Sequence, residues 1–454
     1  MSAAWRLIRS GVSDFELLEL DSVPGGTSRG GGNSVSAYPW GAHYLPCPLP
    51  HARAVVELLV EMGAAARRPD GSLEFDEAAL CRAPQERVFA FGRWEEGLYP
   101  HAGASADDER QLAAFKAEMR RFSEERDARG RRVFAVPAAH GSEDVADLDR
   151  LTIDAWMRAR GYSSPRLRWY VGYACRDDFG ATLEQTSAWA AIHYFASRQV
   201  SGRTQEVMTW PEGNARLVAH LARAAGPRVR PGVAVTRVSG GVVHCFEPRT
   251  GKVEALRADH VILAVPRGFA SRLLGEQPDP IFQTGSWLAV NLTLSRPPLS
   301  RGFPQAWDNV LYDSPSLGYV VATHQQDLPP GRSVWTYYLP MLDHVPALGR
   351  KKLLSLTHAQ ICQAVIADLS RAHPDLTDCI ERIDAWKWGH AMVRPSPGLF
   401  TSPARRAALG PRGRVHFTHA DLSGLALFEE AQHHGVRAAE EILSARAIRF
   451  ESLL

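Results

Sequence analysis

Several classes of protein are excluded by what this sequence lacks. No apolar run approaches the roughly 18 residues that a membrane-spanning helix needs. The N-terminus has neither the positive charges nor the apolar stretch of a secretory signal peptide. As written, the sequence predicts a soluble, cytoplasmic protein, and its location stays open if the true start lies upstream.

Cysteine pairs and an excess of one charge are also missing. The six cysteines are widely separated and form no CxxC pair, so neither a zinc ribbon nor a dense disulfide framework is expected. The 52 basic and 50 acidic residues nearly cancel, which gives no electrostatic reason to expect nucleic acid or an anionic membrane as a partner. The sequence therefore favours a small-molecule substrate, and it leaves the oligomeric state open.

The N-terminal residues have the pattern of a nucleotide-binding unit. Residues 2–10 predict a short helix, which Gly11 ends, and residues 15–20 predict a brief strand. A glycine-rich loop follows, and this order of helix, strand and loop is the tail of a βαβ unit. Glu19, at the strand end, stands where such units hold ribose hydroxyls. Alone it is better explained as a solvated acid at a strand end, but the following Pro24, Gly25 and Gly26 allow the backbone to approach a bulky ligand closely.

The middle of the chain alternates between helical and strand-rich stretches. Residues 51–203 predict mainly helix, including a charged, solvated helix over residues 107–132. Residues 233–256 predict a three-stranded meander, and residues 260–265 predict a buried parallel strand. Residues 269–388 predict a sheet covered by one helix, residues 353–371.

The C-terminal part predicts a strand over residues 415–418, a loop with Asp421, and a long helix from Phe428. His416, His419 and Asp421 together could suggest a metal site. Along a strand, however, His416 and His419 point to opposite faces, so no metal is predicted.

These segments resemble the flavin amine oxidase superfamily, which includes monoamine oxidases, protoporphyrinogen oxidase and phytoene desaturase-like enzymes. LLELDSVPGGTSR is similar to the family's second strand and glycine turn, and WGAH is similar to the element that passes the flavin ring. Two segments resemble those that lie before and after the family's meander, namely TWPEGNARLVAHLARAAG, around Gly213, and HVILAVP. HADLSGLALFEEAQHHGVRAA is similar to the closing motif, in which an acid meets the ribityl-pyrophosphate part of FAD and a helix N-terminus faces the flavin.

The resemblance implies a set of residues that bind FAD. They are Glu19, Gly25, Gly26, Thr27, Gly41, Ala42, His43, Val235, Asp421 and Ala431. WKWGHAMVRPSPG resembles the segment that walls the substrate cavity, which makes Trp388 and His390 the predicted pocket residues. Packing in the core is the alternative reading for Trp386 and Trp388.

Three departures from the family pattern qualify this picture. Ala289 stands where several amine-oxidising members carry a lysine beside the flavin, so amine oxidation by their usual arrangement is in doubt. The cysteine that binds FAD covalently in monoamine oxidases is replaced by RPSPGLF, which predicts noncovalent FAD. The GxGxxG loop and its strand are absent, and because such a strand is central to the sheet, a misplaced start is the expected explanation.

The overall prediction is a two-domain α/β protein. The first domain is a doubly wound FAD-binding domain that comprises residues 1–60, 205–270 and 390–454. It lacks the first strand and the GxGxxG loop and contains a β-meander. An interleaved α+β substrate domain comprises residues 61–204 and 271–389. The predicted function is FAD-dependent oxidation of a C–H bond in an amine or apolar substrate, with no catalytic residue assigned. The alternatives are a polyene or tetrapyrrole desaturase or isomerase of the same superfamily, and a non-catalytic relic that has lost FAD.

Overall fold

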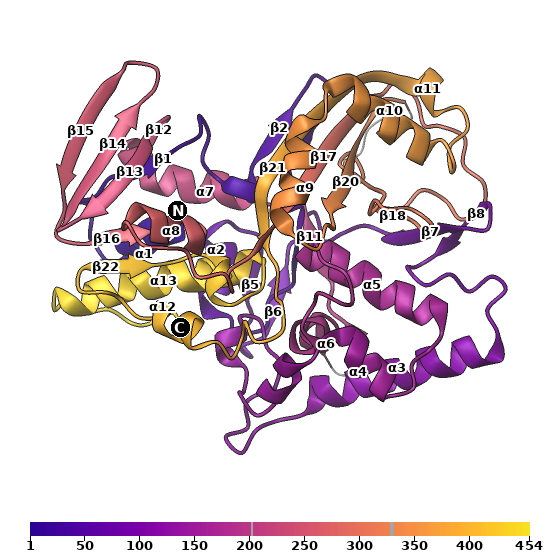
Figure 1. Ribbon diagram of the computed structural model, residues 1–454, viewed down its shortest axis with the longest axis horizontal. Helices are drawn as coiled ribbons and strands as arrows, with labels where there is room; N and C mark the ends of the chain where they lie inside the picture. The colour runs from indigo at the N-terminus through magenta and orange to yellow at the C-terminus, as the bar shows by residue number, and fades with distance from the viewer. Residues whose placement is uncertain (201–202, 327–330) are drawn as a thin grey trace.

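The computed structural model describes residues 1–200, 203–326 and 331–454 and shows two lobes (Figure 1). One lobe holds the meander and both ends of the chain, and the other holds a seven-stranded sheet with helices on its two sides. The lobes are built from interleaved segments, as the sequence predicts for an α/β flavoprotein. The predicted residue boundaries of the two domains stay a prediction.

The first lobe has two pairs of parallel strands. β1 (Leu17–Glu19) pairs with β12 (Val229–Pro231), and β16 (Val261–Leu263) pairs with β22 (Val415–Phe417). Within the described residues these pairs form separate sheets. The predicted meander is confirmed as β13 (Ala234–Ser239), β14 (Val242–Glu247) and β15 (Lys252–Arg257).

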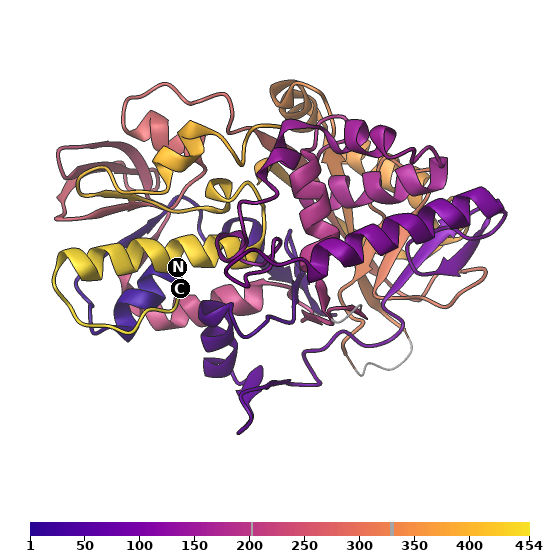
Figure 2. The same ribbon diagram turned by 90° about the horizontal axis from the view of Figure 1, so that it is seen from below.

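Two helices, at opposite ends of the sequence, pack side by side in this lobe. They are α1 (Ser2–Arg9) and α13 (Phe428–Ala445), seen together in Figure 2. A Cβ on Gly435 of α13 would lie 2.8 Å from the Cβ of Ser2, so glycine permits this close approach. Both helices begin within a residue or two of the predicted positions.

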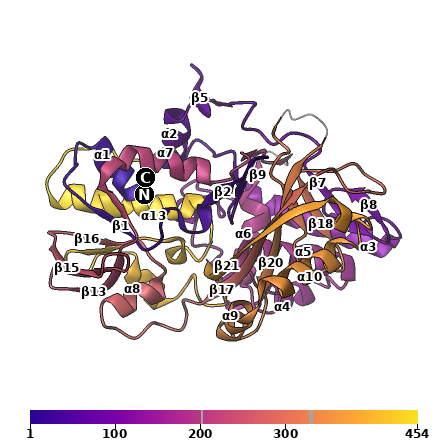
Figure 3. The same cartoon turned by 90° about the horizontal axis from the view of Figure 1, so that it is seen from above.

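The second lobe is built on a sheet of order β21-β17-β20-β19-β18-β7-β8. Its strands are β17 (Thr284–Leu294), β18 (Asp308–Leu311), β19 (Tyr319–Val321), β20 (Ser333–Met341), β21 (Ile380–Val393), β7 (Glu86–Ala90) and β8 (Arg93–Glu96). Figure 3 shows α9 (Pro346–Ser355) and α10 (His358–Leu369) beside β17 and β21. On the other side of the sheet lie α3 (Ala106–Glu124), α4 (Ile153–Ala159), α5 (Pro165–Phe179) and α6 (Ala188–Ser197).

Two sequence predictions for this lobe were wrong. The helix expected over residues 353–371 is instead two helices, α9 (Pro346–Ser355) and α10 (His358–Leu369). Thr357 separates them, because it and Gln360 form a reciprocal capping box that starts α10. The mainly helical region also contains the β7–β8 hairpin, whose turn residues Phe91 and Gly92 both have positive φ. Residues 201–202 of that region lie outside the described residues.

The helices of residues 106–197 pack around one aromatic core. They are α3 (Ala106–Glu124), α4 (Ile153–Ala159), α5 (Pro165–Phe179) and α6 (Ala188–Ser197). The charged face of α3 is exposed as predicted, but Leu112, Phe115 and Met119 on its other face are buried. This periodicity fixes which side of α3 faces the protein.

The remaining helices and strands are shorter or peripheral. They are α2 (Arg53–Glu61), α7 (Ala215–Ala225), α8 (Arg267–Leu273), α11 (Leu376–Cys379), α12 (Pro403–Ala408), β2 (Gly30–Gly32), β3 (Ala37–Pro39), β4 (Tyr44–Pro46), β5 (Ala65–Arg67), β6 (Leu73–Phe75), β9 (Gln199–Val200), β10 (Arg203–Thr204) and β11 (Val207–Thr209). Among the helices of the described ranges, none is long and apolar enough to cross a bilayer.

Candidate active site

The glycine-rich loop after β1 packs against the Gly41–Ala42 segment. The amide of Ala42 donates to the carbonyl of Thr27 at 2.8 Å, and a Cβ on Gly41 would lie only 2.3 Å from that carbonyl oxygen. Gly25 has φ +131°, a backbone conformation that L side chains rarely adopt. The structure thus brings together Gly25 to Thr27 and Gly41 to His43, two segments that the resemblance assigns to one ligand.

Glu19 ends β1, beside this loop. One of its carboxylate oxygens accepts from the amide of Asp21 at 2.9 Å, which orients the side chain and leaves further acceptor positions. Val235 lies apart from the loop, at a β-bulge in the meander, where it packs into an apolar cluster with Leu18. Glu19 and Val235 therefore stand near the parallel pair β1–β12.

Asp421 follows β22 and is held firmly in place. Its Oδ2 accepts from the amide of Arg267 at 2.8 Å, and its Oδ1 lies 2.8 Å from Nδ1 of His419. Burial opposes ionisation of this carboxyl, but the charge and hydrogen bond of His419 keep its pKa below the ordinary value. Asp421 is thus a carboxylate, consistent with binding ribityl hydroxyls.

The N-terminus of α13 follows directly and has no side-chain cap, because Leu427 is the capping residue. Ala431 lies in the first turns, and its amide donates to the carbonyl of Leu427. Glu429 and Glu430 are both buried there, and burial raises the pKa of each to about 7. Near neutral pH these acids are only partly ionised, which limits repulsion of an anionic group at the helix terminus.

These features fit a flavin dinucleotide in its separate parts. The acid at the end of β1 suits a ribose, the closely packed glycines suit a flat ligand passing the backbone, and the uncapped terminus of α13 suits an electron-rich ring. The donors come from segments that lie far apart in the sequence.

A cavity of about 460 Å³ opens beside the Gly41 segment. His43 and Tyr338 stand at this end, with stacked rings 5.1 Å apart, and the Tyr338 hydroxyl donates to the carbonyl of Gly41 at 2.8 Å. Burial lowers the pKa of His43 to about 4, so its imidazole is neutral. Its Nδ1–H donates to the same carbonyl at 3.2 Å, since a carbonyl can only accept.

The rest of the cavity is lined by aromatic rings and acids. The aromatic residues that line it are Tyr44, Phe115, Tyr170, Tyr173, Tyr194, Phe195, Trp307 and Tyr319. Asp177 comes from α5, and Asp308 of β18 is the register partner of Glu86 on the parallel strand β7. Of all the described residues, none forms an ion pair with these three acids, whereas Arg198 is paired with Asp178 at 2.7 Å.

Burial and neighbouring acids disfavour ionisation of this cluster. Burial first, and then the charge of Asp178, raises the pKa of Asp177 to about 7. Burial, Asp177 and Glu86 raise the pKa of Asp308 well above its ordinary value. The cavity is therefore acidic but only partly ionised near neutral pH. Arg198, which lines it, and Arg176 partly offset the charge of Asp177, and Lys116 and Arg120 stand exposed among the lining residues.

Neither of the sequence-predicted pocket residues, Trp388 and His390, is among the residues that line this cavity. Trp388 donates from its indole to the carbonyl of Trp40 at 2.6 Å, in an apolar cluster that also contains Tyr338. His390 bonds Thr284 at 2.8 Å and contacts Phe269. Their predicted role at the flavin face stays a prediction.

The acids of the cavity were missed by sequence reasoning. One signal was available, because Tyr170, Tyr173 and Asp177 are spaced at three and four residues and so share one face of α5. The approach of Asp308 to Glu86 has no local signal, since it depends on pairing of strands more than 200 residues apart.

Comparison with known proteins identifies the family. The family model for flavin-containing amine oxidoreductases matches residues 1–443. The chain belongs to that family. It is therefore an amine-oxidase-like flavoprotein, an oxidoreductase that acts on a small molecule. A search of curated protein sequences finds no significant match.

Solved structures with the same fold agree with this assignment. A variant of putrescine oxidase is 15% identical, with a TM-score of 0.67 and coverage of 98% of this chain and 96% of the other. Cyclohexylamine oxidase from Brevibacterium oxydans is 16% identical, with a TM-score of 0.66 and the same coverage. A fatty acid isomerase from P. acnes is 14% identical, with a TM-score of 0.66 and coverage of 98% and 95%.

Proposed function

We propose that the protein binds FAD noncovalently and oxidises an amine whose ammonium group enters the acidic aromatic cavity. The acids of the cavity, which have no ion-pair contact among the described residues, carry this proposal. Asp308 and Glu86 are like charges in paired register positions, an arrangement that costs free energy unless a cation or protons neutralise it. An ammonium group supplies that charge.

The aromatic rings suit the same ligand. Tyr44 and Trp307 meet edge to face at 5.8 Å between ring centres, and both line the cavity with Tyr194. A cation near such ring faces gains about 0.5 to 2 kcal/mol, and more as water is excluded. The names of the putrescine and cyclohexylamine oxidases support an amine, although this chain has Ala289 in place of the expected lysine.

The chain's own residues provide the proton chemistry that an amine requires. When bound, a flavin supplies an acceptor for the hydride from the carbon next to nitrogen. An ammonium must first lose a proton, and Asp177, with a pKa of about 7, is matched to accept it near neutral pH. His43 orients its ring through the Gly41 carbonyl and leaves Nε2 as a hydrogen-bond acceptor.

The proposal is tested with purified flavin-loaded protein mixed anaerobically with amines. Bleaching of the flavin absorbance by a primary amine or diamine is expected. D177N should raise the KM for cationic substrates about tenfold or more, because a charge-assisted contact contributes about 1.5 to 3 kcal/mol. D147N, at an exposed position away from the cavity, is the matched control and should leave the KM unchanged.

Two results would contradict this function. Purified protein that takes up no flavin would favour the non-catalytic relic. Bleaching or isomerisation with an unsaturated apolar substrate, and none with amines, would favour the desaturase or isomerase alternative, which the fold of the fatty acid isomerase accommodates.

A further inference from the structure

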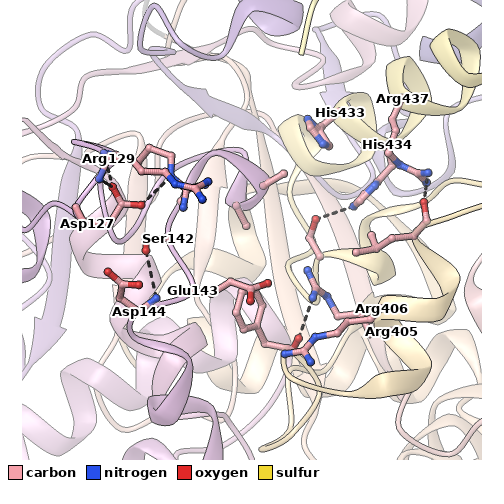
Figure 4. Close-up of a pocket in the computed structure, with 18 residues that line it drawn as sticks. Asp127, Arg129, Ser142, Glu143, Asp144, Arg405, Arg406, His433, His434 and Arg437 are labelled. Atoms are coloured by element: carbon pink, nitrogen blue, oxygen red, sulfur yellow. Dashed lines mark hydrogen bonds and ion pairs between the residues drawn. The ribbon is translucent and has the colours of Figure 1, made fainter. Parts of the chain in front are cut away.

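A second cavity, of about 550 Å³, lies between α12, α13 and the segment that follows α3 (Figure 4). It is on the side of α13 away from α1. Gly435 contacts α1, whereas His433 and Arg437, two positions to either side, project about 200° around the helix and line the cavity. This cavity is thus distinct from the acidic aromatic cavity of the candidate active site.

The wall formed by α12 and α13 is strongly basic. Arg405, only 8% exposed, donates to the carbonyls of Leu422 at 2.6 Å and Phe400 at 2.8 Å. Arg406 lies beside it. Neither guanidinium forms an ion pair with any residue that the structure describes. Arg437 is already paired with Glu441, so Arg405 and Arg406 are the arginines of this wall without an ion-pair contact among the described residues. Glu430, Asp149 and Glu143 act on the charge of Arg405 from a greater distance.

His434 is the most informative residue in the cavity. It is 2% exposed, and its Nε2 lies 2.8 Å from the Ser423 hydroxyl, which itself donates to Glu430. When Glu430 is ionised, the Ser423 proton is used in that bond, and Nε2 of His434 is then the donor. Its Nδ1 is buried without a partner, and so is Nε of Arg437. Unsatisfied polar atoms in a cavity wall indicate a missing partner.

The opposite wall has a different character. Asp127 is engaged by Nε of Arg131 at 2.7 Å, and Arg129, Glu143 and Asp144 also line this wall, so it carries charges of both signs. The two walls together therefore suit a molecule with an anionic group at one end and hydroxyl or amine donors at the other. The cavity volume exceeds that of a simple inorganic ion.

We propose that this cavity binds a small molecule through an oxyanion, a phosphate or a carboxylate, which lies against Arg405, Arg406 and Arg437, with a hydroxyl of the same molecule facing Nδ1 of His434. The guanidinium groups supply charge and directed N–H donors. The Nε–H of Arg437, which is buried without a partner, is a further donor beside them. Burial and the neighbouring cations hold the pKa of His434 well below its ordinary value, so its Nδ1 remains a hydrogen-bond acceptor.

The test measures binding of inorganic phosphate and of succinate to the flavin-loaded protein, by calorimetry and by thermal unfolding at constant ionic strength. Saturable binding of at least one of the two is expected, and the stronger ligand identifies the group recognised. R406Q should weaken it about tenfold, since Arg406 is exposed and its loss spares the core. H434N should also weaken it.

R158Q is the matched control, because Arg158 is an exposed arginine on α4, outside the cavity. It should bind as the unmodified protein does, and flavin absorbance should stay unchanged as the anion binds. Equal weakening in R158Q and R406Q, a flavin spectrum that follows anion binding, or no saturable binding of either anion would overturn the proposal.

Discussion

Removing the Arg198 guanidinium is expected to destabilise the second lobe strongly. Arg198 is 2.7 Å from Asp178, with side-chain exposures of 11% and 7%, and it also donates to the Tyr44 hydroxyl at 2.9 Å. R198M leaves the Asp178 charge buried without its partner. Breaking a buried pair in this way costs about 3 to 5 kcal/mol, and the variant also loses the hydrogen bond from the guanidinium to the Tyr44 hydroxyl.

The assay is urea unfolding followed by tryptophan fluorescence. The double variant R198M/D178L should recover most of the lost free energy of unfolding, because both charges are replaced by apolar groups. R158M removes an exposed arginine from Asp154, which keeps its second partner Arg168, and should cost no more than about 1 kcal/mol. If R198M costs no more than R158M, or the double variant is no more stable than R198M, the buried-pair reasoning is refuted.

Three further predictions concern the predicted flavin site. Glu19→Ala should weaken FAD binding about ten- to hundredfold in a flavin titration, through loss of a charged acceptor for the ribose, and unchanged affinity would contradict that role. Burial raises the pKa of Glu429 from 4.5 to about 7. Between pH 4.5 and about 7 the native state keeps this proton, whereas the unfolded state has lost it. The free energy of unfolding should therefore fall with rising pH across that range, by up to about 3 kcal/mol. Glu429→Gln should flatten that decline, and an unaltered pH profile would disprove the assignment. Trp388→Phe should change the flavin spectrum or turnover with little loss of Tm, and early melting with normal kinetics would show a core role instead.

The sequence by itself determined the parts of the protein whose signals are local. Glycines, prolines and apolar periodicity were enough to predict α1, the strand that ends at Glu19, the meander, the Asp421 loop and α13. The same segments carried the resemblance to flavin amine oxidases. Local patterns failed where a short strand lay between helices, and β7 was missed because its alternation covers only five residues.

The tertiary structure alone decided where the chemistry gathers. Glu86 and Asp308 come together only because β7 and β18 pair in parallel, and Asp177 reaches them from α5 on a different part of the chain. The raised pKa of Glu429 likewise depends on burial beneath distant segments. Spacing along the chain encodes the periodicity of a helix or strand, but a cavity is made by contacts between residues far apart in the sequence, and only the packed fold specifies those.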